Sequence, residues 1–139
     1  DSIQAVTWAN DAGLNVWGYF MLGLLGDTPE TMEATARLAR TLPLDLCNFS
    51  LAAPYPGTEL GRLAGERGWL TESTWESYDQ NYRAIVDQPG CAHQEVLAAQ
   101  RRAYLRWYGS WRGMKFLLQA WRPRYTRFLW RVAMNHGRI

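Results

Sequence analysis

The spacing of hydrophobic residues predicts an alternation of helices and strands along the first half of the chain. Ile3 and Val6 lie at helical spacing within residues 2–12, and Gly13 is a typical C-terminal stop, so a helix is expected there. Residues 15–24 form an apolar run that is too short and too rich in glycine for a helix. Because odd and even positions are both apolar, this run predicts a strand covered on both faces, as in a parallel sheet.

The next segment carries the signals of a helix start and stop. Thr28 can accept hydrogen bonds as an N-cap, and Pro29 suits the first helical position because its missing N–H costs nothing there. Glu30 favours the positive end of the helix, and Pro43 ends it. The expected packing face consists of Met32, Ala36 and Ala39.

The same cycle then repeats. Residues 44–53 predict a second strand, and residues 58–68 predict a helix that closes at Gly68. Strand, crossover helix, parallel strand and helix is the order of an α/β fold with about two parallel βα units. Parallel sheets place ligands at the C-terminal ends of their strands, so the turns GLLGDT and APYPGT should share one rim. Two such strands would leave unpaired edges, so further strands are expected from elsewhere.

The chain divides into three predicted parts: residues 1–70 with the βα units, a connector over 71–92, and a basic, aromatic-rich helical extension over 93–139. One short helix is expected in the connector near residues 72–78. The extension should contain two helices, the second over residues 122–135. The aromatic stripe of the first is Tyr104, Trp107, Tyr108 and Trp111. The second places Tyr125, Phe128, Leu129 and Val132 on one face, and Arg124, Arg127 and Arg131 on the other.

Charge is distributed unevenly over the 139 residues. All 13 acidic residues precede residue 96, whereas residues 96–139 hold nine arginines and Lys115. The basic segment can pack its rings on the rest of the protein, lie on an anionic membrane surface, or bind single-stranded nucleic acid. Packing is favoured, membrane contact comes second, and nucleic acid is the least favoured.

Other features bear on location and on the extent of the chain. No apolar run approaches the eighteen residues of a membrane span, and the N-terminus has no signal-peptide pattern. The two cysteines, Cys47 and Cys91, fit neither a disulfide framework nor a metal knuckle, which favours a reducing compartment. We therefore expect a cytoplasmic protein. The alternative is a cytoplasmic protein that also contacts a membrane surface through residues 96–139. The start at Asp1 suggests a piece of a longer protein.

Common catalytic patterns are weak in this sequence. Two histidines, His93 and His136, make a hydrolytic triad improbable, and helix capping explains the acidic pair Asp27 and Glu30. The turn GLLGDT is neither a phosphate-binding loop nor a dinucleotide fingerprint. Its glycines still bring backbone amides to a helix N-terminus, where an adenine, a ribose or a carboxylate could approach. A plain βα turn is the competing interpretation.

Two motifs, at the observed separation, resemble a known family. FMLGLLGDTPE is similar to FxxGxPGxTxE, and PYPGTEL follows one helix later. This combination resembles the late barrel strands of radical S-adenosylmethionine enzymes, especially the branch with an N-terminal cobalamin-binding domain. The resemblance covers roughly residues 1–70 and, more loosely, the tail with RRAYLRWY and RPRY. Leu25 stands where that family usually has a proline.

The resemblance implies a partial (β/α) barrel followed by a helical C-terminal extension, with S-adenosylmethionine at the C-terminal rim. It implies a four-iron, four-sulfur cluster held by a CxxxCxxC motif, which this chain lacks, so the cluster ligands and any cobalamin would lie in a missing N-terminal part of the same protein. Alone, the chain should have no radical activity. The cofactor-binding residues implied here are Met21, Gly23, Gly26, Ala53 and Pro54. For Met21, a place in the hydrophobic core is an equally supported interpretation.

The implied function is a contribution to the adenine site and to the substrate-side wall of such an enzyme. The complete enzyme would perform radical chemistry or cobalamin-dependent methyl transfer on a small-molecule or lipid-like substrate. The alternative is a non-catalytic, basic and aromatic module that binds a membrane surface or nucleic acid, with the βα units as its scaffold.

Overall fold

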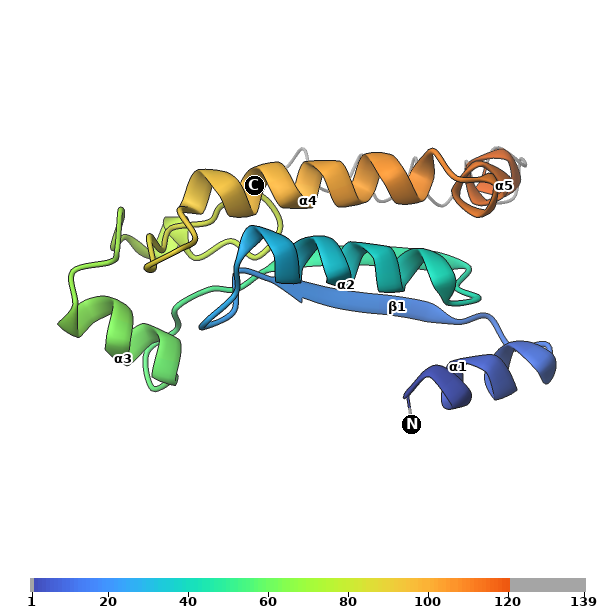
Figure 1. Ribbon diagram of the computed structural model, residues 1–139, viewed down its shortest axis with the longest axis horizontal. Coiled ribbons are helices and arrows are strands. Elements are labelled where there is room, and N and C mark those ends of the chain that lie inside the picture. The colour runs from blue at the N-terminus through green and yellow to red at the C-terminus, as the bar shows by residue number, and fades with distance from the viewer. Residues whose placement is uncertain (1, 121–139) are drawn as a thin grey trace, which may run out of the picture.

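The computed structural model describes residues 2–120. The regular elements among these residues are two strands, five α-helices and one short 3₁₀ helix. Figure 1 shows their arrangement. The elements are α1 (Ser2–Asp11), β1 (Trp17–Leu22), α2 (Pro29–Thr41), β2 (Leu46–Leu51), α3 (Glu59–Glu66), η1 (Trp75–Ser77), α4 (His93–Tyr108) and α5 (Trp111–Ala120). The predicted helix over residues 122–135 lies outside the described residues.

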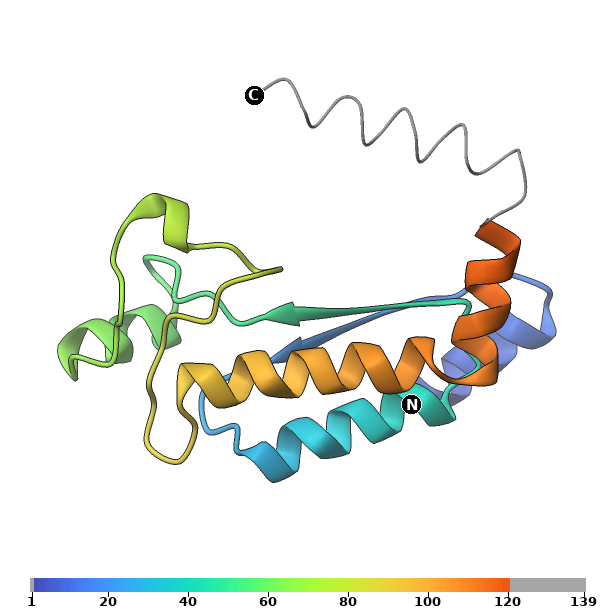
Figure 2. The ribbon, with the colours of Figure 1, turned by 90° about the horizontal axis from the view of Figure 1, so that it is seen from above.

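The two strands pair side by side and in the same direction. Trp17 is the register partner of Leu46, and Leu22 is the partner of Leu51. This confirms the predicted parallel pair and makes the described part an α/β structure. Helices α2 and α4 lie together over one face of the strands (Figures 1 and 2).

The main core lies between that face and the two helices. The predicted packing face of α2, Met32, Ala36 and Ala39, is buried there as expected. Helix α4 contributes Val96, Ala99, Ala103 and Trp107, and the strands contribute Leu22, Cys47, Phe49 and Leu51. Helix α4 thus shares one core with the βα units. The division into three parts stays a prediction.

Helix α2 begins where the sequence predicted. The backbone N–H of Thr31 donates to Oγ1 of Thr28 at 3.4 Å, and Pro29 occupies the start of the helix. Thr58 caps α3 in the same way, through the N–H of Gly61 at 3.1 Å. The caps satisfy backbone donors that would otherwise be unpaired at each helix start.

The opposite face of β1 is largely uncovered by the described residues. The side chains of Trp17, Tyr19 and Met21 are 59%, 68% and 40% exposed, respectively. The expectation of a strand covered on both faces is therefore wrong for residues 2–120. Both faces are apolar, but only the one toward α2 and α4 belongs to the described core.

The outer edge of β2, by contrast, is closed by polar side chains. Tyr108 donates to the carbonyl of Cys47 at 3.2 Å, and Gln100 donates to the carbonyl of Phe49 at 2.7 Å. The N–H of Phe49 donates to the hydroxyl of Tyr104 at 3.1 Å. These three α4 residues are spaced four positions apart and so share one helix face. The N–H of Leu51 donates to the carbonyl of Gln80 in the connector at 2.6 Å.

Only one strand edge therefore remains open within residues 2–120. The carbonyls of Leu22 and Val16 point toward β2, where they accept from the N–H groups of Ala52 and Leu46, respectively. The backbone N–H and C=O groups of residues 17, 19 and 21, which alternate with them, therefore point away from β2. No described residue pairs with their outward N–H and C=O groups. The expectation that both strands expose edges is wrong for β2, because α4 side chains substitute for a neighbouring strand.

The predicted aromatic stripe is divided between two helices. Helix α4 ends at Tyr108, and α5 begins at Trp111 after a turn in which Oγ of Ser110 accepts from the N–H of Gly113. A Cβ atom on Gly113 would lie 2.4 Å from the carbonyl oxygen of Trp107, so this tight turn requires glycine. Trp107 is buried and Trp111 is exposed, which corrects the expectation of one continuous stripe.

Candidate functional site

The C-terminal ends of the two strands form one rim. The N–H of Ala52 donates to the carbonyl of Leu22 at 2.8 Å, which holds the strand ends at the same level. The turns that start at Gly23 and Ala53 therefore leave the sheet side by side, as the sequence predicted. In parallel sheets this end is where ligands bind.

The first turn, residues 23–28, is held in a defined conformation by Asp27. Its Oδ2 accepts from the N–H of Leu24 at 2.9 Å, and its Oδ1 accepts from the hydroxyl of Thr31 at 2.8 Å. Gly23 and Gly26 have φ angles of +80° and +82°, a region that other residues rarely adopt. Both glycines are thus required by the path of the turn.

Gln88 from the connector clamps the same turn. Its Nε2 donates to the carbonyl of Leu24 at 2.8 Å, and its Oε1 accepts from the N–H of Gly26 at 3.0 Å. The residue is only 6% exposed, so its amide has little access to water as an alternative partner. Oδ1 of Asp87, one residue earlier, accepts from the N–H of His93 at the start of α4, at 2.7 Å. Residues 87–93 thus tie the rim to α4.

Sequence reasoning missed Gln88. A single glutamine in an irregular connector belongs to no helical or strand pattern, so periodicity cannot detect it. The nearest signal was Pro89 followed by Gly90, a pair that is typical of a tight turn. The turn forms, with the N–H of Cys91 donating to the carbonyl of Gln88 at 3.0 Å.

The three predicted residues of the first strand and turn have different surroundings. Met21 lies partly exposed on the uncovered face. A Cβ atom on Gly23 would lie 2.8 Å from a methyl carbon of Val96, so the missing side chain makes room for α4. The N–H of Gly26 already has Gln88 as its acceptor, so that amide is not open to a ligand as the sequence argument assumed. Cofactor binding at the three residues stays a prediction.

Ala53 and Pro54 begin the second turn. The N–H of Tyr55 donates to the carbonyl of Ala53 at 2.9 Å, and the turn packs so tightly on α3 that a Cβ on Gly61 would lie 2.4 Å from the carbonyl oxygen of Tyr55. Pro54 is buried and lines a cavity of about 510 Å³, a size that accommodates small ligands. The other lining residues are Pro56, Gly57, Thr58, Glu59, Gly61, Arg62, Leu70 and Tyr78.

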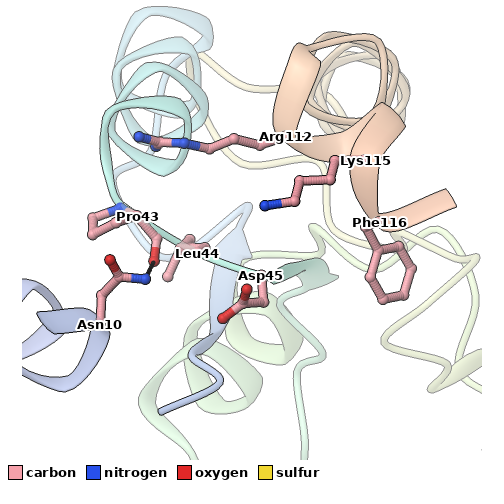
Figure 3. Close-up of a pocket in the computed structure, with 7 residues that line it drawn as sticks. All are labelled: Asn10, Pro43, Leu44, Asp45, Arg112, Lys115 and Phe116. Atoms are coloured by element: carbon pink, nitrogen blue, oxygen red, sulfur yellow. Dashed lines mark hydrogen bonds between the residues drawn. The ribbon is translucent and has the colours of Figure 1, made fainter. Parts of the chain in front are cut away.

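A second cavity, of about 190 Å³, lies at the opposite end of the strands (Figure 3). Arg112 from α5 donates to the carbonyl of Leu42 at the end of α2, at 2.7 Å. Asp45 accepts from the N–H of Val16 through Oδ2, at 2.8 Å. Both side chains thereby pair with backbone groups next to the ends of helices or strands. Lys115 extends into the space between Arg112 and Asp45 (Figure 3). We assign this cavity a structural role.

The two cysteines do not fit an iron–sulfur cluster. Cys47 and Cys91 are free, buried thiols on different elements, and residues 2–120 contain no group of three His, Cys, Asp or Glu side chains that could hold a metal. Burial raises the pKa of Cys47 to about 12 and raises the pKa of Cys91 as well. Metal ligation requires thiolates, which this burial disfavours.

Helix length and hydropathy also bear on membrane contact. Among residues 2–120, none of the helices combines the length and the apolar character that a bilayer crossing demands. The basic segment beyond residue 120 lies outside the described residues.

Comparison with known proteins finds similarity to methyltransferases. No protein-family profile matches the chain. It is 32% identical over 107 residues to an uncharacterized methyltransferase of Pyrococcus horikoshii, covering 77% of this chain and 23% of that protein. It is 31% identical over 74 residues to the bacteriochlorophyllide d C-8(2)-methyltransferase of Chlorobaculum tepidum, covering 53% of this chain and 16% of that protein.

A third relative is named for a different reaction. The anaerobic magnesium-protoporphyrin IX monomethyl ester cyclase of Rubrivivax gelatinosus is 30% identical over 64 residues, covering 46% of this chain and 12% of the cyclase. The chain thus spans less than a quarter of the length of each of these relatives. The similarity supports a relationship to methyltransferases and, more broadly, to radical S-adenosylmethionine enzymes.

Proposed function

We propose that this chain is part of a radical S-adenosylmethionine methyltransferase, in which β1 and β2 belong to a (β/α) barrel. The observation that carries the proposal is the rim where the two motif-bearing turns leave adjacent parallel strands. The resemblance of both turns to one family and the names of two relatives point in the same direction. In the complete protein, the rim would bind the cofactor, and the uncovered face of β1 would face the substrate.

The residues at the rim fit the adenine of S-adenosylmethionine. Met21 offers a polarizable, apolar side chain on the uncovered face, next to the strand end. Gly23, Ala53 and Pro54 would contact the base through their backbones, and Gly26 through its Cα, since its N–H is already bonded. When bound, S-adenosylmethionine would supply a methyl group or a radical. The task of this chain would be to hold its adenine and to shape the wall beside it.

The cluster and any cobalamin would be held by the remainder of the same polypeptide. The open outer edge of β1, at positions 17, 19 and 21, supports the proposal that another strand pairs there. The closed edge of β2 supports a place for β2 as the last strand of that sheet. The substrate would be a small molecule or a lipid-like molecule.

The test uses the natural full-length protein, reconstituted with iron and sulfide under anaerobic conditions. We expect S-adenosylmethionine to be converted to 5′-deoxyadenosine or S-adenosylhomocysteine in the presence of a reductant. Met21→Asp should weaken S-adenosylmethionine binding about tenfold or more, because a carboxylate replaces an apolar contact. Met114→Asp is the matched control on the exposed surface of α5. Neither product, or equal effects of both substitutions, would refute the proposal.

A second candidate function is contact with an anionic membrane surface. Trp111, Met114 and Leu118 are exposed on α5 at spacings of three and four, so they form one apolar face. Arg112 and Lys115 lie on the same helix, and residues 121–139 carry five more arginines and no acidic residue. An apolar stripe beside cations is the pattern of helices that lie in a membrane interface.

Vesicle sedimentation tests this second function. The full-length protein should bind vesicles of phosphatidylcholine and phosphatidylglycerol better than vesicles of phosphatidylcholine alone. Trp111→Glu should reduce that binding several-fold, whereas Trp75→Glu, at an exposed tryptophan of the connector, should leave it unchanged. Equal binding to both vesicle types, or preferential binding of single-stranded oligonucleotides, would contradict membrane contact.

A further inference from the structure

The uncovered face of the strand pair also carries two polar side chains. Asn48 is the register partner of Tyr19, and Ser50 is the partner of Met21. Partners in a parallel pair present their side chains on the same face of the sheet, so Asn48 and Ser50 lie beside the exposed apolar side chains of β1. The amide Nδ2 of Asn48 donates to the hydroxyl oxygen of Ser50 at 3.2 Å.

The orientation of the Asn48 amide follows from its contact with Tyr104. The hydroxyl of Tyr104 accepts from the N–H of Phe49 at 3.1 Å and has a single proton to donate. Two acceptors are near: Oδ1 of Asn48 at 2.5 Å and the carbonyl of Phe49 at 3.3 Å. That carbonyl already accepts from Gln100 at 2.7 Å. The proton therefore goes to Asn48, which makes its Oδ1 the atom that faces Tyr104.

This arrangement leaves hydrogen-bond donors for a ligand. Oδ1 of Asn48 accepts from Tyr104, and one of the two amide hydrogens is donated to Ser50. The second amide hydrogen has no hydrogen-bond partner within residues 2–120. The Ser50 oxygen accepts from Asn48, so its own proton is available as well. Both groups would donate to a ligand rather than accept from it.

The surroundings define the chemistry of that ligand. The described strand residues on this face are Trp17, Tyr19, Met21, Leu46, Asn48 and Ser50, and none of them is charged. Neutral donors suit a carbonyl or carboxylate oxygen, whereas polyanions such as phosphates favour arginine or lysine. Exposed indole and phenol rings offer flat contact surfaces for a flat, apolar body.

We propose that Asn48 and Ser50 bind a carbonyl or carboxylate oxygen of the substrate, whose flat, apolar body lies over Trp17 and Tyr19. Tyr104 is a positioning residue that orients the Asn48 amide. This inference rests on the proposed function, which assigns the uncovered face to the substrate. Asn48 lies two residues before Ser50, about 6 to 7 Å further from the rim where the cofactor is proposed, so the subsite extends away from the adenine.

The test compares two flat probes on the full-length protein. Mesoporphyrin IX carries two carboxylates, and etioporphyrin has the same macrocycle with alkyl groups only. Asn48→Asp replaces the donor with a repelling carboxylate and should raise the Kd for mesoporphyrin about tenfold, the effect of losing one good hydrogen bond. Ser50→Ala should raise it several-fold. Neither substitution should change the Kd for etioporphyrin. Asn15→Asp and Ser73→Ala, both at exposed positions, are the matched controls.

Measuring S-adenosylmethionine affinity on the same samples separates the possible failures. Unchanged cofactor affinity with the selective loss of mesoporphyrin binding supports the inference. If the unaltered protein does not bind mesoporphyrin, or if both probes are affected equally, the subsite is refuted. A raised Kd for S-adenosylmethionine in both variants would assign Asn48 and Ser50 to the cofactor site. That result would also refute the proposed substrate subsite. If the unaltered protein binds no S-adenosylmethionine at all, the proposed function fails independently.

Discussion

Gln88 holds the backbone of Gly26 from 62 positions further along the chain, through a hydrogen bond of 3.0 Å between Oε1 and the glycine N–H. Its second bond, from Nε2 to the carbonyl of Leu24, spans the same turn from the other side. A buried amide that uses both its donor and its acceptor fixes the position of the turn it contacts. The rim of the strand pair thus depends on a residue in an otherwise irregular connector.

Gln88→Glu should lower the free energy of unfolding by about 1 to 3 kcal/mol. The carboxylate can still accept from Gly26, but it cannot donate to Leu24, whose carbonyl then faces a buried negative charge. Urea denaturation of the full-length protein measures the effect. Gln94→Glu, the same change at an exposed position of α4, should alter stability by less than about 0.5 kcal/mol. Equal losses in the two variants would rule out the clamp.

Gly23→Ala should destabilise the protein for two separable reasons. A φ of +80° costs a residue with a Cβ about 1 to 2 kcal/mol, and the new Cβ would lie 2.8 Å from a methyl carbon of Val96. In a Val96→Ala background the steric part should disappear while the backbone part remains. A double-mutant cycle in urea separates the two. If the free-energy changes of the two substitutions simply add, the contact between the new Cβ and Val96 does not destabilise the protein.

Tyr104→Phe should cost about 1 to 2 kcal/mol, because it leaves the edge N–H of Phe49 without its acceptor. The ring itself is kept, so its edge-on contact with the Phe49 ring, at a centroid distance of 5.3 Å, survives. Tyr82→Phe removes a hydroxyl from a largely exposed ring and serves as the control. If the two variants unfold at the same urea concentration, the hydroxyl does not stabilise the strand edge.

The isolated 139-residue chain should self-associate through the outer edge of β1. A strand edge with unpaired N–H and C=O groups beside exposed apolar side chains is a template for pairing with a second copy. Tyr19→Lys places a charge beside that edge and should shift the chain toward monomer in sedimentation velocity. Trp8→Lys, at an exposed tryptophan on α1, controls for general surface hydrophobicity. Association that persists equally in both variants would point to a different contact surface.

Stability should fall as the pH rises above about 9. Burial raises the pKa of Cys47 to about 12, whereas the unfolded thiol ionises near its ordinary value of 9.0. Between these values the folded chain keeps a proton that the unfolded chain has lost, so alkali favours unfolding by up to about 1.4 kcal/mol per pH unit for this group. Below pH 9 the thiol is neutral in both states and has no effect.

Urea titrations at pH 8 and pH 10.5 check this expectation. Burial also raises the pKa of Tyr104 and Tyr108, so part of the alkaline loss will remain when the thiol is removed. Cys47→Ala should be less stable at pH 8, because it leaves a small cavity, but it should lose less stability between the two pH values. Identical losses in the parent and the variant would exclude Cys47 as a contributor.

The sequence predicted the elements whose signals are local. Thr28 and Pro29 define a helix start through groups only a few residues apart, and Gly23 marks a turn through its own backbone requirement. The parallel pairing followed from the order of elements, since a helix between two apolar strands returns the chain in the same direction.

The remaining features depend on partners that carry no sequence signature. The spacing of Gln100, Tyr104 and Tyr108 indicates one helix face. These side chains contact backbone groups of β2. Because every residue has the same backbone groups, no sequence pattern identifies β2 as the partner. The uncovered face of β1 was missed because an apolar side chain indicates burial without naming what covers it. Of the predicted site, the adjacency of the two turns is confirmed, and the cofactor role of Met21 and its neighbours stays a prediction.

The difference between the two borders of the strand pair has a practical consequence for dissecting the protein. Removing the chain beyond Tyr108 would leave the three α4 side chains on β2 in place. Ending it before Gln100 would remove these side chains and leave the backbone groups of β2 unpaired as well. Copies of such a fragment would then pair on both sides and assemble into open-ended chains. A shorter piece would thus be harder to handle than a longer one, and α4 is the part that an experimenter should keep.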